Sequence, residues 1–133
     1  MLKINKRFLI ALLTFTLPFG CGGCAPDGSS VTYEQISGAE AKALMDSESG
    51  YIIIDARTQE EYDQGHIPGA ILIPEYEIAD RAEKQLPDKD QLILVYCRSG
   101  RRSKIAAEEL VKLGYTNVKE FGGIIDWEYE IEK

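Results

Sequence analysis

The sequence has few of the side chains that most often hold metals, with three cysteines and one histidine among 133 residues. Zinc ribbons and His-rich metal centres need more such ligands, so no metal site is expected. Basic side chains are also scarce: 15 stand against 22 acidic ones, a formal net charge of −7. A nucleic-acid partner is not expected, because neutralising phosphates takes a basic surface. The length excludes a two-domain enzyme, while 44% hydrophobic residues are enough for one folded domain.

The first twenty residues are typical of a secretory signal peptide. Three basic residues among the first seven precede an uncharged apolar run over residues 8–19. This run is too short to cross a bilayer, which takes ~20 residues, and it matches the apolar part of an export signal. We therefore expect residues 1–20 to be a signal peptide, residues 21–30 a polar tether, and residues 31–133 the folded domain. Without the signal the formal charge is −10, since the signal holds three basic side chains and no acidic one.

Two cysteines, Cys21 and Cys24, follow the apolar run, and each is preceded by glycine. A Gly-Cys pair at this place resembles the lipobox of bacterial lipoproteins, in which the cysteine is lipidated and becomes the new N-terminus. The resemblance implies an exported, extracytoplasmic protein that is anchored in the membrane through a lipid on Cys21, with Cys24 as the alternative. Two other interpretations stay open: an uncleaved N-terminal anchor, and a disulfide between the two cysteines.

Strand-like and helix-like segments alternate along the rest of the chain. Apolar runs rich in β-branched residues indicate buried strands, and two Ser/Thr-x-x-Glu capping boxes, at 37–40 and 58–61, indicate helix starts. The alternation predicts an α/β fold with a largely parallel sheet, in which ligands bind beyond the carboxyl ends of the strands. The expected strands are 32–36, 51–54, 70–73, 91–96 and 117–121, and the expected helices are 37–45, 58–65, 75–86, 103–113 and 124–133.

The third cysteine, Cys97, stands between a buried strand and a helix. The loop after it contains Ser99 and Gly100, which suit a tight turn whose backbone N–H groups point inward as an anion site. The N-terminal end of the following helix adds positive potential. Arg98, Arg101 and Arg102 add three cations, and no acidic residue occurs from 91 to 107, where the charge is +4.

These features predict a lowered pKa for Cys97 and an oxyanion site beside its sulfur. A nucleophilic thiolate next to an anion site suits attack on an anionic substrate. The alternative is that Cys97 is a small buried apolar residue, which is the commoner role of a single cysteine. Three arginines and a glycine so close to it favour the nucleophile.

These residues resemble the rhodanese-like domain family, over roughly Thr32 to Trp127. The resemblance implies a five-stranded, largely parallel sheet flanked by helices, with Cys97 as the catalytic residue. It also implies that Arg98, Ser99, Gly100, Arg101, Arg102 and Ser103 bind the substrate. The motifs that carry it are Cys97-Arg98-Ser99-Gly100-Arg101-Arg102, Asp55-Ala56-Arg57, Glu61-Tyr62, Gly65-His66-Ile67-Pro68-Gly69-Ala70, Gly122-Gly123 and Trp127.

The length of the loop carries information about the substrate. Cys97 to Arg102 is Cys-x₄-Arg, which is similar to the sulfurtransferases of the family. The related phosphatases and arsenate reductases use Cys-x₅-Arg, whereas here the sixth residue after Cys97 is Ser103. The resemblance therefore implies a monomeric thiosulfate sulfurtransferase that works through a Cys97 persulfide, without metal or organic cofactor. The sulfur would pass to cyanide or a thiol. The alternatives are a non-catalytic sulfur-carrier or partner-binding module and, less favoured, a phosphatase or arsenate reductase.

Other polar residues receive supporting or structural interpretations. Asp55 ends a strand on the side of the loop and is expected to support it, while Arg57 is expected to pair with Glu60 or Glu61. His66 is assigned a structural hydrogen-bonding role, because an ionised thiolate needs no base. Trp127 is expected in the core, with a position at the pocket rim as the alternative. The acidic tail, Asp126, Glu128, Glu130 and Glu132, is expected to be a solvated helix face.

Overall fold

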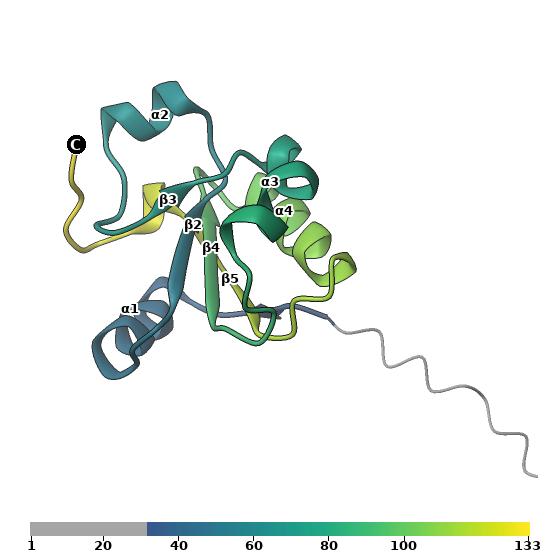
Figure 1. Ribbon diagram of the computed structural model, residues 1–133. Coiled ribbons are helices and arrows are strands. Elements are labelled where there is room, and N and C mark those ends of the chain that lie inside the picture. The colour runs from purple at the N-terminus through teal and green to yellow at the C-terminus, as the bar shows by residue number, and fades with distance from the viewer. Residues whose placement is uncertain (1–31) are drawn as a thin grey trace, which may run out of the picture.

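Five parallel strands form the centre of the structure, a computed structural model that describes residues 32–133 (Figure 1). The order of the strands is β1-β5-β4-β2-β3, and every neighbouring pair is parallel. The predicted α/β class and five-stranded sheet are confirmed. The strands are β1 (Glu34–Gln35), β2 (Ile52–Asp55), β3 (Ile71–Leu72), β4 (Ile93–Cys97) and β5 (Val118–Gly123).

Helices connect the strands, as parallel pairing requires. Both predicted capping boxes are formed: Ser37 and Glu40 cap the first helix, and Thr58 and Glu61 cap the second. The helices are α1 (Gly38–Ser47), α2 (Gln59–Gln64), α3 (Ile78–Gln85) and α4 (Arg101–Lys112), with single 3₁₀ turns at η1 (Glu75–Glu77) and η2 (Ile124–Asp126). None of the helices described in residues 32–133 is long and apolar enough to cross a membrane.

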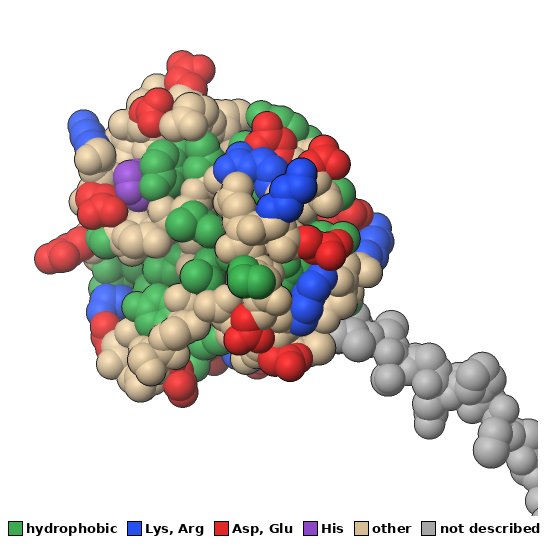
Figure 2. All heavy atoms as spheres, viewed as in Figure 1, with side chains coloured by type: hydrophobic (Ala, Val, Ile, Leu, Met, Phe, Trp, Pro, Cys, Tyr) green, Lys and Arg blue, Asp and Glu red, His purple; other side chains and the backbone are tan. Residues whose placement is uncertain are grey.

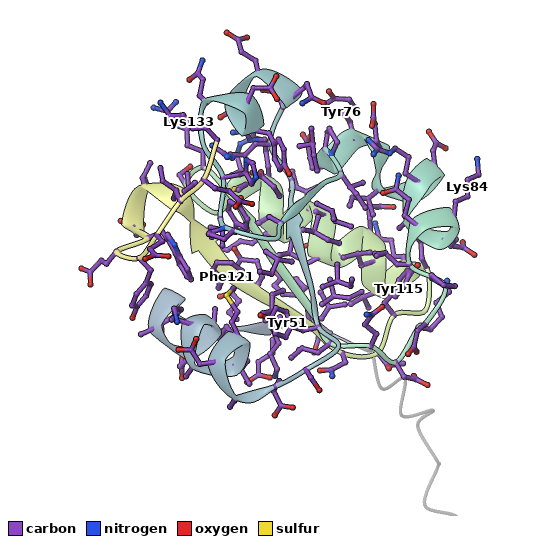
Figure 3. The ribbon with its side chains drawn as sticks, turned by 60° about the vertical axis from the view of Figure 1, so that its left-hand side comes forward. Tyr51, Tyr76, Lys84, Tyr115, Phe121 and Lys133 are labelled. Carbon is purple, nitrogen blue, oxygen red and sulfur yellow. The ribbon has the colours of Figure 1, made fainter. Side chains whose placement is uncertain are left out.

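The sheet is buried on both faces, and all five residues of β4 are buried. Side chains alternate between the two faces along a strand, so Val95 and Cys97 face α3 and α4, while Leu94 and Tyr96 face α1. Figure 3 shows Tyr115 on the α4 side of the sheet, and Tyr51 and Phe121 on the α1 side. Strand β4 is thus enclosed along its whole length, and its last residue, Cys97, lies at the carboxyl edge of the sheet.

The carboxyl ends of β2, β4 and β5 meet at one edge of the sheet. Asp55 pairs in register with Tyr96, and Cys97 pairs with Gly123 after an irregularity in the ladder between Val95 and Cys97. Helix α2 leaves β2 at this edge, and α4 begins there (Figure 1). The edge is the position at which parallel sheets bind ligands.

The prediction of a last helix over residues 124–133 is wrong. Only the turn η2 forms, after which the chain is extended and makes an antiparallel bridge in which His66 and Glu132 exchange both backbone hydrogen bonds at 2.8 Å. Trp127, Tyr129 and Ile131 alternate with glutamates, and this two-residue period suits extended backbone better than a helix. The acidic tail is therefore not a helix face.

Several other boundaries differ from the expectation by one to three residues. Helix α4 begins at Arg101 instead of residue 103, because Gly100 (φ +106°) already ends the loop. The segment 75–86 is divided into η1 and α3. The predicted signal peptide, the tether, and the lipidation sites Cys21 and Cys24 lie outside the described residues.

The Cys97 loop packs closely against β5 at Gly123, which has no side chain to keep the loop away. A Cβ atom at Gly123 would meet the Arg98 carbonyl and the Ser99 Cα at less than the 3.0 Å that real Cβ atoms keep, and both are backbone atoms. We expect Gly123→Ala to lower the free energy of unfolding by about 1–3 kcal/mol, as overpacking does, and to change the alkylation rate of Cys97. Urea denaturation and iodoacetamide labelling measure the two effects.

Gly38→Ala is the matched control, since a Cβ there finds only ring atoms of Trp127, at 3.6 Å. This variant should stay within about 0.5 kcal/mol of the wild type. Equal stability and equal Cys97 reactivity in both variants would contradict the close packing of the loop on β5.

Candidate active site

The Cys97 side chain lies at the bottom of a short loop, with only 1% of its surface exposed. The loop residues 98–100 turn back over it, and the Gly100 amide donates a hydrogen bond to the sulfur at 3.0 Å. Gly100 has φ +106°, a conformation that other residues rarely adopt, so this position requires glycine. The predicted inward-facing amide site is thus present around the sulfur.

The predicted lowering of the Cys97 pKa is confirmed, although the cause differs in emphasis. Burial of the sulfur raises the pKa, and hydrogen bonds from Ser103, Gly100 and Ser99 outweigh it, so the net pKa lies below the usual value. From the sequence, the three arginines were expected to contribute much of the lowering of the Cys97 pKa. In the structure, hydrogen bonds are the main cause of the lowered pKa, and the Gly100 amide lies 3.0 Å from the sulfur, since a thiolate is stabilised most by groups that touch it.

The three arginines of the loop have different environments. Arg102 binds Glu61 with both guanidinium nitrogens, at 2.6 and 2.8 Å. Arg98 and Arg101 are exposed and form no ion pair within residues 32–133. On the face shown in Figure 2, positive side chains lie among acidic ones and form no broad basic surface. Arg98 and Arg101 are therefore the cations of the loop that are open to an arriving anion.

Glu61 is a site residue that sequence reasoning missed. Its side chain was assigned to the capping box with Thr58, which it forms, but the same carboxylate also holds Arg102 from α4. The hydrogen bond from Arg102 is the largest cause that lowers the pKa of Glu61, and with hydrogen bonds from Thr58 and the charge of Arg102 it outweighs the effect of burial and brings the pKa to about 2. Glu61 therefore stays ionised and fixes the first turn of α4 against α2.

Asp55 and Arg57 form a buried pair, so the expected pairing of Arg57 with Glu60 or Glu61 is wrong. Arg57 binds the Asp55 carboxylate through Nε and through Nη2, the latter at 2.7 Å, and also donates to the Gly65 carbonyl. Asp55 is the last residue of β2 and Arg57 lies two residues further on, and both side chains are buried, so the guanidinium reaches the Asp55 carboxylate without being exposed.

The Asp55 carboxylate also fixes the residue that precedes Cys97. The Tyr96 hydroxyl donates to Asp55 at 2.7 Å and accepts from the Ile67 amide at 3.0 Å. Burial and the negative charge of Asp55 raise the pKa of Tyr96 well above its usual value, so the hydroxyl keeps its proton. Asp55 thus supports the loop from the opposite face of the sheet, through Tyr96, without touching the sulfur.

His66 and Trp127 have the structural positions expected of them. His66 stacks on Tyr62, and its ring nitrogens lie 3.0 Å from the Tyr62 carbonyl and 3.2 Å from the Glu132 carboxylate. Trp127 is partly buried and packs on Phe121 against the core on the α1 side. Neither side chain contacts Cys97.

A groove of about 500 Å³ lies beside the loop. Arg57, Arg98 and Glu61 form part of its wall, and Ile125 and Ile131 line it although they are 62% and 53% exposed. The isoleucines come from the tail that was expected to be a helix, so the sequence did not indicate this apolar wall. A second hollow, of about 450 Å³ and lined by Met45, Tyr51 and Trp127 among others, lies on the α1 face, away from the cysteine.

Glu120 is the other residue that sequence reasoning missed. It lies in the middle of β5, is 3% exposed, and accepts a hydrogen bond from the Ser103 hydroxyl at 2.6 Å. Ser103, which was expected to bind substrate, is itself fully buried. The only signal in the sequence is that Glu120 falls inside an expected strand, where a glutamate is uncommon when the strand is buried.

Residues 37–130 match the profile of the rhodanese-like domain. The chain belongs to the rhodanese-like domain family. The loop 97–102 and all the motifs that carried the resemblance lie within the matched range.

The relatives of this rhodanese-like chain include a protein named as a sulfurtransferase and one named as a putative sulfur carrier. It is 45% identical over 73 residues to thiosulfate sulfurtransferase PspE of Escherichia coli (strain K12), a match that covers 55% of this chain and 70% of that protein. It is 36% identical over 107 residues to putative sulfur carrier protein YrkF of Bacillus subtilis (strain 168), covering 80% of this chain and 57% of that protein.

A solved structure agrees with the fold of this rhodanese-like domain. The structure titled "rhodanese with anions from E. coli" superposes with a TM-score of 0.59 and 41% identity, over 62% of this chain and 98% of that one. The sheet and its flanking helices are therefore those of the family.

The Glu61–Arg102 pair predicts how stability depends on pH. The pKa of Glu61 falls from 4.5 to about 2 on folding, so the pair stabilises the fold above pH 4.5 and loses that effect as the pH falls towards 2. Over this range we expect the wild type to lose roughly 1–3 kcal/mol more than Glu61→Gln, after allowance for partial exposure. Urea denaturation at a series of pH values measures the difference.

Glu60→Gln is the matched control, because Glu60 is exposed and forms no ion pair in the described part of the chain. This variant should follow the pH dependence of the wild type. If Glu61→Gln loses stability with acid as steeply as the other two proteins, the ion pair does not stabilise the fold.

Proposed function

We propose that the protein is a thiosulfate sulfurtransferase that carries sulfur as a persulfide on Cys97. One observation carries the proposal: the only cysteine of the described domain is a thiol of lowered pKa, held by hydrogen bonds in a loop of six residues. Membership of the family and the similarity to relatives named thiosulfate sulfurtransferase support the same chemistry.

In the first step the Cys97 thiolate attacks the outer sulfur of thiosulfate. A bond forms between the Cys97 sulfur and that outer sulfur, while the sulfur–sulfur bond of thiosulfate breaks and sulfite leaves with its electron pair. Arg98 and Arg101 are placed to attract the dianion, and amides of the loop stabilise the negative outer sulfur of the persulfide. The step uses no metal and no organic cofactor.

In the second step a nucleophile removes the outer sulfur. Cyanide attacks it and leaves as thiocyanate, or a thiolate attacks it and becomes a persulfide, and in either case the electron pair of the broken bond returns to Cys97. The loop 97–102 is one continuous segment of the chain, and we propose that the protein acts as a monomer.

A second candidate is a sulfur carrier that holds the persulfide for a partner without rapid turnover. The similarity to a putative sulfur carrier protein and the apolar wall of the groove favour it. Phosphatase or arsenate reductase activity is less favoured, because the loop is Cys-x₄-Arg and Arg102 is occupied by Glu61. Turnover separates the first two: a carrier takes up one sulfur atom, whereas an enzyme makes thiocyanate repeatedly.

Thiosulfate should add one sulfur atom to the protein, because the Cys97 thiolate is the nucleophile. Intact mass spectrometry after thiosulfate treatment measures the addition, and release of thiocyanate from thiosulfate and cyanide measures turnover. We expect Cys97→Ser to lose both. The control makes the same substitution elsewhere: Cys21→Ser/Cys24→Ser should keep both. Thiocyanate production that survives Cys97→Ser would refute the proposal.

We also propose that residues 1–20 direct export and that Cys21 is lipidated, with Cys24 as the alternative acceptor. The uncharged run 8–19 and the Gly-Cys pairs support this. Expressed in a lipoprotein-processing bacterium, the protein should appear in the membrane fraction with a diacylglyceryl mass on its new N-terminal cysteine. Cys21→Ser should remove that mass and Cys24→Ser should not. The opposite pattern would move the site to Cys24, and an unmodified, full-length chain would contradict lipidation.

A further inference from the structure

Exposed apolar side chains gather in the groove beside the Cys97 loop. Residues 32–133 have five large apolar side chains that are exposed, and two of them, Ile125 and Ile131, line this one groove. Ile124, which is partly buried, extends the same wall. A single exposed isoleucine is ordinary on a protein surface, but several in one hollow mark a place where something binds. The volume of about 500 Å³ is that of a small-molecule site.

Backbone contacts hold the two exposed isoleucines in this wall. The Ile125 amide donates to the Arg98 carbonyl at 3.3 Å, so this part of the chain is attached to the residue that follows Cys97. Ile131 lies against Gly65, where an added Cβ atom would meet the Ile131 Cδ1 at 3.2 Å. The antiparallel bridge at the next residue holds the chain there by two backbone hydrogen bonds of 2.8 Å. The groove is therefore a formed part of the fold, and it opens next to the loop.

One charge in the groove is not paired. The charged side chains that line it are Arg57, Glu61 and Arg98. Arg57 is bound to Asp55, and Glu61 is bound to Arg102. Arg98 forms no ion pair within residues 32–133, and no acidic side chain of residues 126–133 lines the groove. A ligand that matches this lining has an apolar part for the isoleucines and one negative group for Arg98.

We propose that this groove binds the acceptor of the sulfur atom, and that the acceptor is an aliphatic thiol with one anionic group such as a carboxylate. The alkyl chain of the acceptor lies along Ile125 and Ile131, and its anionic group binds Arg98. Arg98 attracts thiosulfate in the first step and is free again once sulfite has left. The inference rests on the proposed function for the transfer itself, and it names the class of acceptor that the proposed function leaves open.

The transfer needs no reactant besides the bound thiol. The thiol gives its proton to solvent, and the thiolate attacks the outer sulfur of the Cys97 persulfide. A bond forms between these two sulfur atoms, while the bond from the outer sulfur to Cys97 breaks and its electron pair returns to Cys97. The acceptor leaves as a persulfide, and Cys97 is again a thiolate. Cyanide has no alkyl part, so the groove selects among acceptors and is not needed for every transfer.

Binding of carboxylates that have no thiol tests the site by itself. Acetate, butanoate and hexanoate are titrated into the protein, and backbone amide NMR signals report where they bind. We expect the amides of Arg98, Ile125 and Ile131 to shift, and each added methylene to tighten binding roughly two- to fourfold. Hexanol, which has a similar length and no charge, should bind roughly two- to fivefold more weakly than hexanoate. Equal affinity for acetate and hexanoate, or shifts confined to other residues, would overturn the site.

Sulfur transfer in a single turnover tests the role of the groove for the acceptor. The persulfide form is mixed with mercaptoacetate or 6-mercaptohexanoate, and intact mass spectrometry follows the loss of one sulfur atom. The rate with the longer thiol divided by the rate with the shorter thiol should fall at least about threefold in Ile125→Ser, because the variant lacks part of the apolar wall. The chemical reactivity of the thiols cancels when this ratio is compared between proteins.

A second groove variant and a matched control keep the result decisive. Ile131→Ser should lower the same ratio, and it serves if Ile125→Ser is unstable in thermal unfolding. Ile105→Ser makes the same change at an exposed position of α4 outside the groove and should keep the ratio of the wild type. An unchanged ratio in both groove variants would overturn the assignment of the acceptor.

The two experiments separate failure of this inference from failure of the proposed function. Hexanoate that binds in the groove of a protein that forms no persulfide would refute the sulfurtransferase, and with it the acceptor, but not the binding site. A persulfide that forms and is transferred at the same ratio in all variants, without hexanoate binding, would refute the acceptor site alone. That second outcome would leave the apolar wall to the partner of a sulfur carrier.

Discussion

A buried sulfur atom can carry negative charge only where hydrogen-bond donors face it. At Cys97 these donors are the amides of the loop and Ser103, and they more than offset the effect of burial on the thiol pKa. Three features of the fold hold the donors in place. Strand β4 sets the position of the sulfur, Gly100 allows the loop to turn back, and the absence of a side chain at Gly123 lets the loop lie against β5.

Ion pairs and hydrogen bonds hold this loop from two sides. On the α4 side, Glu61 binds Arg102 and so fixes the helix that begins directly after the loop. On the α1 side, Arg57, Asp55 and the hydroxyl of Tyr96 form a chain of contacts behind the strand. The residues before and after the loop, Tyr96 and Arg102, are therefore both held by buried or half-buried carboxylates.

Much of the fold could be predicted from the sequence, because its signals are local. The apolar β-branched runs gave the buried strands, and the capping boxes gave the starts of α1 and α2. The position of Cys97 at a strand end gave the place of the site. The last segment was mistaken because its acidic residues suggested a helix face, although the alternation of Tyr129 and Ile131 with glutamates indicated extended chain.

The partners within the site could not be predicted from local signals. Glu61 and Arg102 are 41 residues apart, and Ser103 and Glu120 are 17 apart, so only the folded sheet brings them together.

The packing of the Arg98 backbone on Gly123 also limits how the length of the loop can change in evolution. A fifth residue between cysteine and arginine, as in the Cys-x₅-Arg loops that accept a tetrahedral oxyanion, would have to displace β5 as well as the loop. An insertion in the Cys97 loop would therefore be tolerated only together with a compensating change in β5. The sequences of these two segments are thus expected to change together.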